Sequence, residues 1–199
     1  MKIFIFTILD KTKRQILRFA DSSYAPMALF AVAFAEASVF LVPPDILLVA
    51  ALLIDRSKWI RYALLTTIGS VLGAFLGYLI GWAFYESIGA ALVKAYHLQG
   101  AVQYVGLKFQ ENAFVVIFAA AFTPIIPFKA ITIASGVFNV SLYKLFVVSL
   151  FGRGLRYFVI AYLTYLLGER AKIFISRYFW LLSTLVVLIV ALLWWFLLK

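Results

Sequence analysis

Long apolar runs, each interrupted by prolines or charges, fill most of this chain. The first run, residues 25–54, contains Glu36, Pro43, Pro44 and Asp45. It is too short for two full membrane crossings, because each needs about 20 residues. The run therefore predicts either one kinked span or one re-entrant helical hairpin.

Basic residues on both sides of this run favour the hairpin. Lys and Arg are frequent in residues 1–24 and again in residues 56–61. A single crossing would place two positive clusters on opposite faces of the membrane, against the positive-inside rule. A hairpin that enters and leaves by the cytoplasmic side satisfies the rule, with Pro43 and Pro44 at its tip. Because prolines remove backbone donors, such a tip needs a protein-lined cavity rather than lipid around it.

The second broken run, residues 113–138, predicts a second re-entrant hairpin with Pro124 and Pro127 at its tip. The apolar stretch 62–93 between the two runs is long enough for one full span. The second hairpin should therefore enter from the opposite face of the membrane. Two such hairpins form an inverted repeat, an architecture typical of transporters.

The two broken runs also align with each other without a gap. Segments 34–50 and 118–134 pair so that Pro43 falls on Pro127, whereas acidic Asp45 falls on basic Lys129. We expect the function to lie where the two tips meet.

Four glycines recur at four-residue spacing in the span between the hairpins: Gly69, Gly73, Gly77 and Gly81. Residues four apart share a helix face, and small residues let another helix approach closely. We interpret this stripe as an internal packing face, with homodimerisation through it as the alternative.

The remaining segments complete an all-α integral membrane protein. Residues 1–24 are predicted to form an amphipathic interfacial helix, because charged residues rather than a cleavage site follow the first apolar residues. One membrane domain then covers residues 25–168, ending in a full span over 142–167. Residues 178–198 predict a final transmembrane helix. The fold is thus two re-entrant hairpins plus about three transmembrane helices, with the N-terminus in the cytoplasm.

Composition agrees with a membrane location and excludes several functions. Hydrophobic residues make up 66% of the chain, charged residues 13%, and the mean hydropathy is +1.06. The net charge of +10 comes from residues that flank apolar runs, so it indicates contact with anionic lipid rather than with nucleic acid. There is no cysteine, no His-Glu-x-x-His motif and no Ser-His pairing beyond the lone His97. We therefore expect no enzyme activity, no metal and no cofactor.

Five charged residues fall at membrane depth: Glu36, Asp45, Lys129, Arg153 and Arg156. Each costs about 2.5–3.5 kcal/mol or more in hydrocarbon, so each needs a partner or water. One interpretation is that they only neutralise one another, for instance Asp45 with Lys129 and Glu36 with an arginine. The other is functional: Glu36 or Asp45 exchanges a proton, while the two arginines bind a phosphate with Lys129 nearby. Arg153 and Arg156 suit this role because they are three residues apart and share a helix face.

The order of these features resembles the DedA superfamily, also called VTT or SNARE-associated Golgi-like membrane proteins. The resemblance spans roughly residues 34–168. It is carried by Glu36 with Pro43-Pro44-Asp45, the glycine stripe, Phe122-Thr123-Pro124, Gly136 and Gly152-Arg153-Gly154-Leu155-Arg156-Tyr157. Many members have an arginine on each side of the Phe-x-Pro element, where this chain has Ala121 and Pro127. Together with the later Gly-Arg-Gly-Leu-Arg-Tyr helix, this departure resembles the YqaA-type branch.

The resemblance implies lipid transport across the inner membrane of a bacterial or archaeal cell. Bacterial members of the superfamily are linked to the return of undecaprenyl phosphate and to membrane homeostasis that depends on the proton-motive force, and eukaryotic relatives scramble phospholipids. The sequence thus predicts a flippase or scramblase for a phosphate-bearing lipid. The alternatives are a proton-coupled antiporter of a small cation or drug that uses Glu36 and Asp45, and a purely structural membrane protein.

Overall fold

The computed structural model describes residues 24–38, 43–97, 99–124, 126–168, 170–171, 178, 181 and 184–192. This part of the chain is helical and contains no strand. Two helical segments within it are long and apolar enough to cross a membrane, Arg56–Gly89 and Leu142–Leu167. The predicted helix within residues 1–24 lies almost wholly outside the described residues, as does half of the predicted span 178–198.

The first broken run folds as two short helices, α2 (Ala25–Ser38) and α3 (Pro44–Ile54). Pro43 is the N-cap of α3, with φ −65° and ψ 118°, and Pro44 is its first residue. Proline suits this position because the first N–H groups of a helix have no intrahelical partner. The tandem prolines therefore begin the second helix of the pair.

The second broken run has the same local construction. Helices α7 (Ala113–Phe122) and α8 (Phe128–Val137) are separated by the prolines, and Pro127 is the N-cap of α8 with φ −63° and ψ 108°. The prolines that align in sequence, Pro43 and Pro127, thus occupy the same structural position. A preceding helix, α6 (Gln99–Glu111), meets α7 at a bend: residues 102–111 and 113–122 make an angle of 76°.

A long helix follows each broken pair. Helix α4 (Trp59–Phe84) comes after a short turn, η1 (Arg56–Lys58), and continues through a π-helical turn, η2 (Tyr85–Gly89), into α5 (Ala90–Ala95). Helix α9 (Leu142–Leu167) comes after α8 and has the same length of 26 residues as α4.

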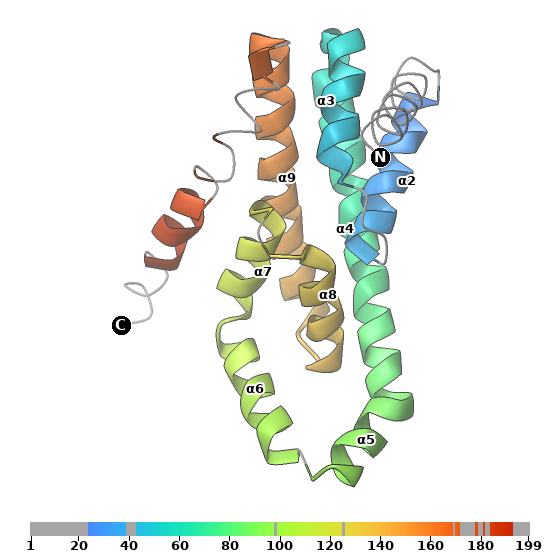
Figure 1. Cartoon of the computed structure of the whole chain (residues 1–199), viewed down its shortest axis with the longest axis vertical. Coiled ribbons are helices and arrows are strands. Elements are labelled where there is room, and N and C mark those ends of the chain that lie inside the picture. Colours follow the sequence, from blue (N-terminus) through green and yellow to red (C-terminus); the bar gives the residue numbers. More distant parts are fainter. Residues whose placement is uncertain are drawn as a thin grey trace, which may run out of the picture.

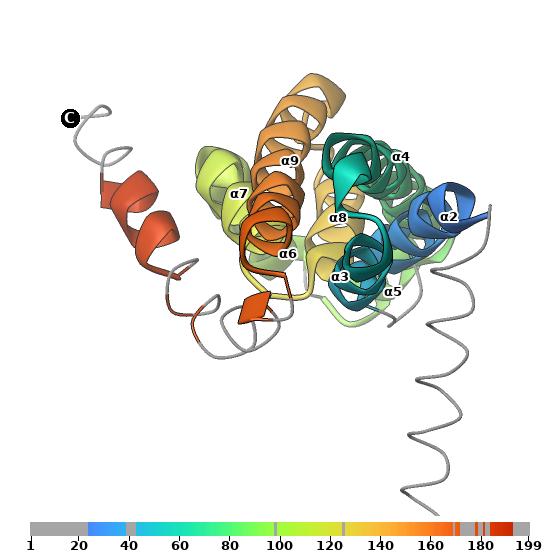
Figure 2. The ribbon, with the colours of Figure 1, turned by 90° about the horizontal axis from the view of Figure 1, so that it is seen from above.

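The two long helices run antiparallel. A Cβ added to Gly168, just after α9, would meet the guanidinium of Arg56, just before α4, at 2.3 Å. Further along, the rings of Phe75 and Phe146 stack with centroids 6.0 Å apart. In Figure 1, α2 and α3 lie beside the upper half of this pair, and α7 and α8 lie in the lower half, so the two proline breaks face each other near mid-height. Seen from above, α8 lies between α9 and α4 (Figure 2).

The glycine stripe of α4 is covered within the chain. A Cβ on Gly69 or Gly73 would lie 2.4 or 2.2 Å from a carbonyl oxygen of α2. A Cβ on Gly81 would lie 2.0 Å from the Ile133 oxygen of α8, and one on Gly77 would lie 2.3 Å from the Thr132 hydroxyl. The upper half of the stripe thus receives α2 and the lower half receives α8. A homodimer would have to use another surface.

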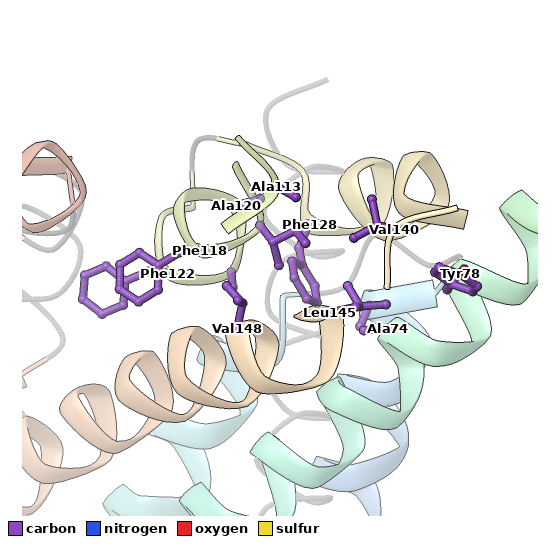
Figure 3. Close-up of a cluster of buried hydrophobic side chains, with 13 residues drawn as sticks. Ala74, Tyr78, Ala113, Phe118, Ala120, Phe122, Phe128, Val140, Leu145 and Val148 are labelled. Atoms are coloured by element: carbon purple, nitrogen blue, oxygen red, sulfur yellow. The ribbon is translucent and has the colours of Figure 1, made fainter. Parts of the chain in front are cut away.

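Two apolar clusters fill the space around these helices. One joins α2, α3, α4 and α9 through Leu29, Leu48, Tyr62 and Tyr157. The other joins α7, α8 and α9 to α4 and includes Phe118, Phe128 and Leu145. Figure 3 shows the second cluster, with Phe128 among side chains of several elements. Each broken pair therefore has its own core, and Ala37 of α2 also packs in the second.

The turn between α3 and α4 is held by Asp55. Its carboxylate accepts hydrogen bonds from the backbone N–H of Ser57, at 3.1 Å, and pairs with Lys58 at 2.8 Å. The hydrogen bond from Lys58 is the largest cause that lowers the pKa of this exposed carboxyl below its usual value. The hydrogen bond from the Ser57 N–H caps the short turn where the chain reverses into the long helix.

Candidate functional site

A cavity of about 280 Å³ lies where the two proline breaks meet. Its charged lining side chains come from four helices, and its walls include Thr123, Phe128 and residues of both breaks. The lining contains all five charges that the sequence placed at membrane depth, together with the four proline residues of the predicted tips: Glu36, Asp45, Lys129, Arg153, Arg156, Pro43, Pro44, Pro124 and Pro127. The fold thus brings the predicted site residues of both runs to one place.

Arg153 of α9 contacts side chains from α2, α8 and its own helix. Its side chain is 2% exposed, and its Nη2 lies 3.1 Å from Oε2 of Glu36 on α2. Nη1 donates a hydrogen bond to the Tyr157 hydroxyl at 2.9 Å. The guanidinium also lies over the Phe128 ring, 4.0 Å from its centroid. Charge, hydrogen bond and cation–π contact together hold this planar group in one orientation.

Arg156, one turn further along α9, pairs with Asp45. Its Nε donates to Oδ1 of Asp45 at 3.3 Å, and its Nη2 donates to Oδ2. This two-point contact is the geometry that favours arginine over lysine for carboxylates and phosphates. Both residues of the pair are largely buried.

Two helix N-termini border the same cavity. Asp45 lies in the first turn of α3, where the helix dipole stabilises a negative charge. Lys129 occupies the corresponding first turn of α8, where the dipole also favours an anion and disfavours a cation. An anionic group in the cavity would therefore be stabilised by the two helix ends and by the basic side chains.

Four buried side-chain atoms in the described part of the chain lack a hydrogen-bond partner: Glu36 Oε2, Ser70 Oγ, Ser149 Oγ and Arg153 Nε. Glu36 Oε2 lies within ion-pair distance of Arg153, but its angles do not make a hydrogen bond. Buried polar atoms are normally satisfied by protein or by a bound molecule. Two of the four belong to the Glu36–Arg153 pair, so part of the hydrogen-bonding capacity of this buried pair is unused.

The structure shows which charged residues pair with each other, and the sequence alone could not show this. Glu36 pairs with an arginine, as one interpretation expected, and that arginine is Arg153. Asp45, which the sequence alignment set opposite Lys129, pairs with Arg156. Lys129 lines the same cavity, and a pairing of Asp45 with Lys129 across the two tips stays a prediction.

Two contributors to the site were missed by sequence reasoning. Phe128 supplies the ring beneath Arg153, and Tyr157 supplies the hydroxyl that accepts its hydrogen bond. Tyr157 carried a signal, because it lies one turn after Arg153 and therefore on the same helix face. An aromatic residue directly after Pro127 gave no comparable signal.

Comparison with known proteins gives the family. The model of the VTT domain matches residues 42–166, which is more than half of the 199 residues. The chain belongs to the VTT-domain family, the DedA family. Members of this family are membrane proteins and are generally proposed to be transporters. The match to the VTT domain runs from the first proline break almost to the end of α9, so it includes Asp45, Lys129 and both arginines, whereas Glu36 precedes it.

A relative with similar length extends this result. An uncharacterized protein of Haemophilus influenzae is 31% identical over 173 residues, which cover 85% of each chain. No solved structure matches the chain significantly. Membership of the VTT-domain family is thus shown by sequence, whereas assignment to the YqaA-type branch stays a prediction.

Proposed function

We propose that this protein moves a phosphate-bearing lipid across the membrane by binding its headgroup in the charged cavity. One observation carries the proposal: Arg153 and Arg156, both buried on one face of α9, line a cavity that two broken helical pairs close from either end. Guanidinium groups bind phosphate oxygens through paired hydrogen bonds. Discontinuous helices whose N-termini face an anionic substrate are a recurring device of transporters.

In this proposal, binding of the headgroup depends on the protonation of the carboxylates. Glu36 and Asp45 already occupy the arginines, so a phosphate competes with them. The lining has three cationic and two acidic side chains, one net positive charge when all are ionised. Protonation of one carboxyl releases an arginine and raises the positive excess to two, which matches a phosphate monoester of charge near −2. Proton uptake and headgroup binding are coupled in this scheme.

The arrangement in the membrane follows from the same elements. In our proposal the α2–α3 pair enters from the cytoplasmic face and the α7–α8 pair from the opposite face, as an inverted repeat of re-entrant hairpins. The shared N-cap position of Pro43 and Pro127 and the equal lengths of α4 and α9 support it. The N-terminus is then cytoplasmic, and the membrane is the inner membrane of a bacterial or archaeal cell.

A proton-coupled antiporter of a small cation or drug is less favoured. Its substrate would have to bind beside three basic side chains, where the net charge repels it. Flux that required Glu36 and Asp45 but ignored lipid phosphate would support the antiporter instead.

Reconstitution tests the proposal. We would place a polyprenyl phosphate in proteoliposomes and measure how fast it becomes accessible to an external phosphatase. The native protein should accelerate exposure, and Arg153→Ala or Arg156→Ala should slow it by about tenfold or more, the equivalent of one charge-assisted hydrogen bond. Arg61→Ala is the matched control, because Arg61 is exposed on α4 and does not line the cavity. An inactive native protein, or full activity in both arginine variants, would contradict the proposal.

A further inference from the structure

A second cavity, of about 510 Å³ and open to the surface, lies at the far end of α8 from the charged site, and its glutamines are exposed. Its walls come from η2, α5, α6 and the turn after α8. Helix α8 joins the two cavities: Phe128 and Lys129 at its start line the first, and Val137, its last residue, lines the second. Ten residues of helix rise about 15 Å, so the cavities are separate sites.

The polar lining of this second cavity is uncharged. Gln99, Gln103 and Gln110 follow one another at helical spacing along α6 and contribute to it, together with Tyr85 and Asn139. No Lys, Arg, Asp or Glu is among its described lining residues. Each amide offers donors and an acceptor without a net charge. The cavity therefore suits hydroxyl groups and gives a phosphate or a carboxylate no counter-charge.

The backbone around this cavity departs from regular geometry at two places. Tyr85 begins the π-helical turn η2, and such turns occur frequently at functional sites. Asn139, just after the end of α8, has φ +50°, a left-handed conformation that asparagine adopts more readily than most residues other than glycine. Gln110 donates a hydrogen bond to the Phe138 oxygen at 2.5 Å, which ties α6 to the end of α8. These features place polar side chains from separate elements around one space.

The remaining lining is apolar and includes Val93, Val102, Leu107 and Val137. A wall of this kind accepts a hydrocarbon chain, while the amides hold a polar head. The geometry points to a binding site for an uncharged polyhydroxyl headgroup on an apolar chain, such as a glycolipid-like amphiphile. This site does not depend on phosphate transport at the arginines.

Direct binding tests this inference. The full chain would be reconstituted in phosphatidylcholine nanodiscs and titrated with radiolabelled octyl β-glucoside below its micellar concentration. We expect a saturable component that excess unlabelled octyl β-glucoside displaces and that octyl phosphate does not. Gln103→Leu should weaken this component about tenfold, the effect of losing about 1.4 kcal/mol of hydrogen bonding.

Controls separate this site from the charged cavity. Lys108→Leu changes an exposed residue of the same helix that does not line the cavity, and it should bind normally. The rate of phosphatase exposure should be the same for Gln103→Leu as for the native protein, which distinguishes failure of this site from failure of phosphate transport. If Gln103→Leu loses its fold, Gln99→Leu replaces it, since Gln99 is also an exposed lining residue. The inference would be overturned if no saturable component were found, or if octyl phosphate displaced it as well as octyl β-glucoside does. It would also be overturned if a folded glutamine variant bound octyl β-glucoside as tightly as the native protein.

Discussion

The guanidinium of Arg153 lies 4.0 Å from the centroid of the Phe128 ring, while its Nη2 lies 3.1 Å from Glu36. Phe128 begins α8 and Glu36 belongs to α2, so one side chain of α9 contacts both broken helical pairs. If the pairs move relative to each other, at least one of these contacts must break. Arg156 pairs with Asp45 of the first pair. A movement of the two helical pairs relative to each other should therefore change the contacts of Arg153.

The Arg153–Phe128 contact should have a measurable coupling energy. In a double-mutant cycle with Arg153→Met and Phe128→Leu, we expect the two effects on the free energy of unfolding to differ from additivity by about 0.5–2 kcal/mol. Reversible unfolding in a lipid–detergent mixture measures it. Strict additivity would show that the ring only fills space.

Loss of the Asp45 carboxylate should destabilise the fold. Asp45→Asn removes the negative charge that faces the buried guanidinium of Arg156, and breaking a buried pair in this way costs about 3–5 kcal/mol. Asp55→Asn is the control, because the same change in an exposed pair should alter the free energy of unfolding little. Equal stability of the two variants would contradict the burial of this ion pair.

Two glycines of α9 should respond oppositely to alanine. A Cβ on Gly152 would lie 2.6 Å from Cβ of Ala121, whereas one on Gly154 would meet its nearest neighbour at 3.7 Å. Gly154→Ala should raise the free energy of unfolding by about 0.5–1 kcal/mol through helix propensity. Gly152→Ala should lower it by about 1–3 kcal/mol, because α7 must move away. Similar effects of both changes on unfolding would argue against close packing of α7 on α9.

The proposed orientation predicts the sides on which single cysteines react. The chain has no natural cysteine, so a single introduced one can be followed without background. Ser57→Cys, before α4, should be protected from a membrane-impermeant maleimide added to intact cells. Tyr104→Cys, on α6 beyond α4, should be labelled, since Tyr104 is 65% exposed. Labelling of both from outside, or of Ser57→Cys alone, would overturn the orientation.

Several features of the fold follow from short-range chemistry and could be predicted from the sequence. Prolines end one helix and begin the next wherever they stand, because they lack an N–H and restrict the preceding residue. The breaks before α3 and α8 were therefore foreseeable. The four-residue glycine spacing predicted a close-packing face on α4, because residues four apart lie on one side of any helix. The division of that face between α2 and α8 was not foreseeable, since it depends on where each helix crosses.

The sequence by itself determined a membrane protein of two broken helical pairs with five charges within its apolar segments, because composition, proline chemistry and helical period act locally. Only the tertiary structure decided that Asp45 pairs with Arg156, 111 residues away, and that Phe128 lies beneath Arg153. The physical reason is that an ion pair needs two groups within a few ångströms. That distance is set by the position of each helix along its axis and by its rotation about that axis. Both depend on all the residues that pack between the helices.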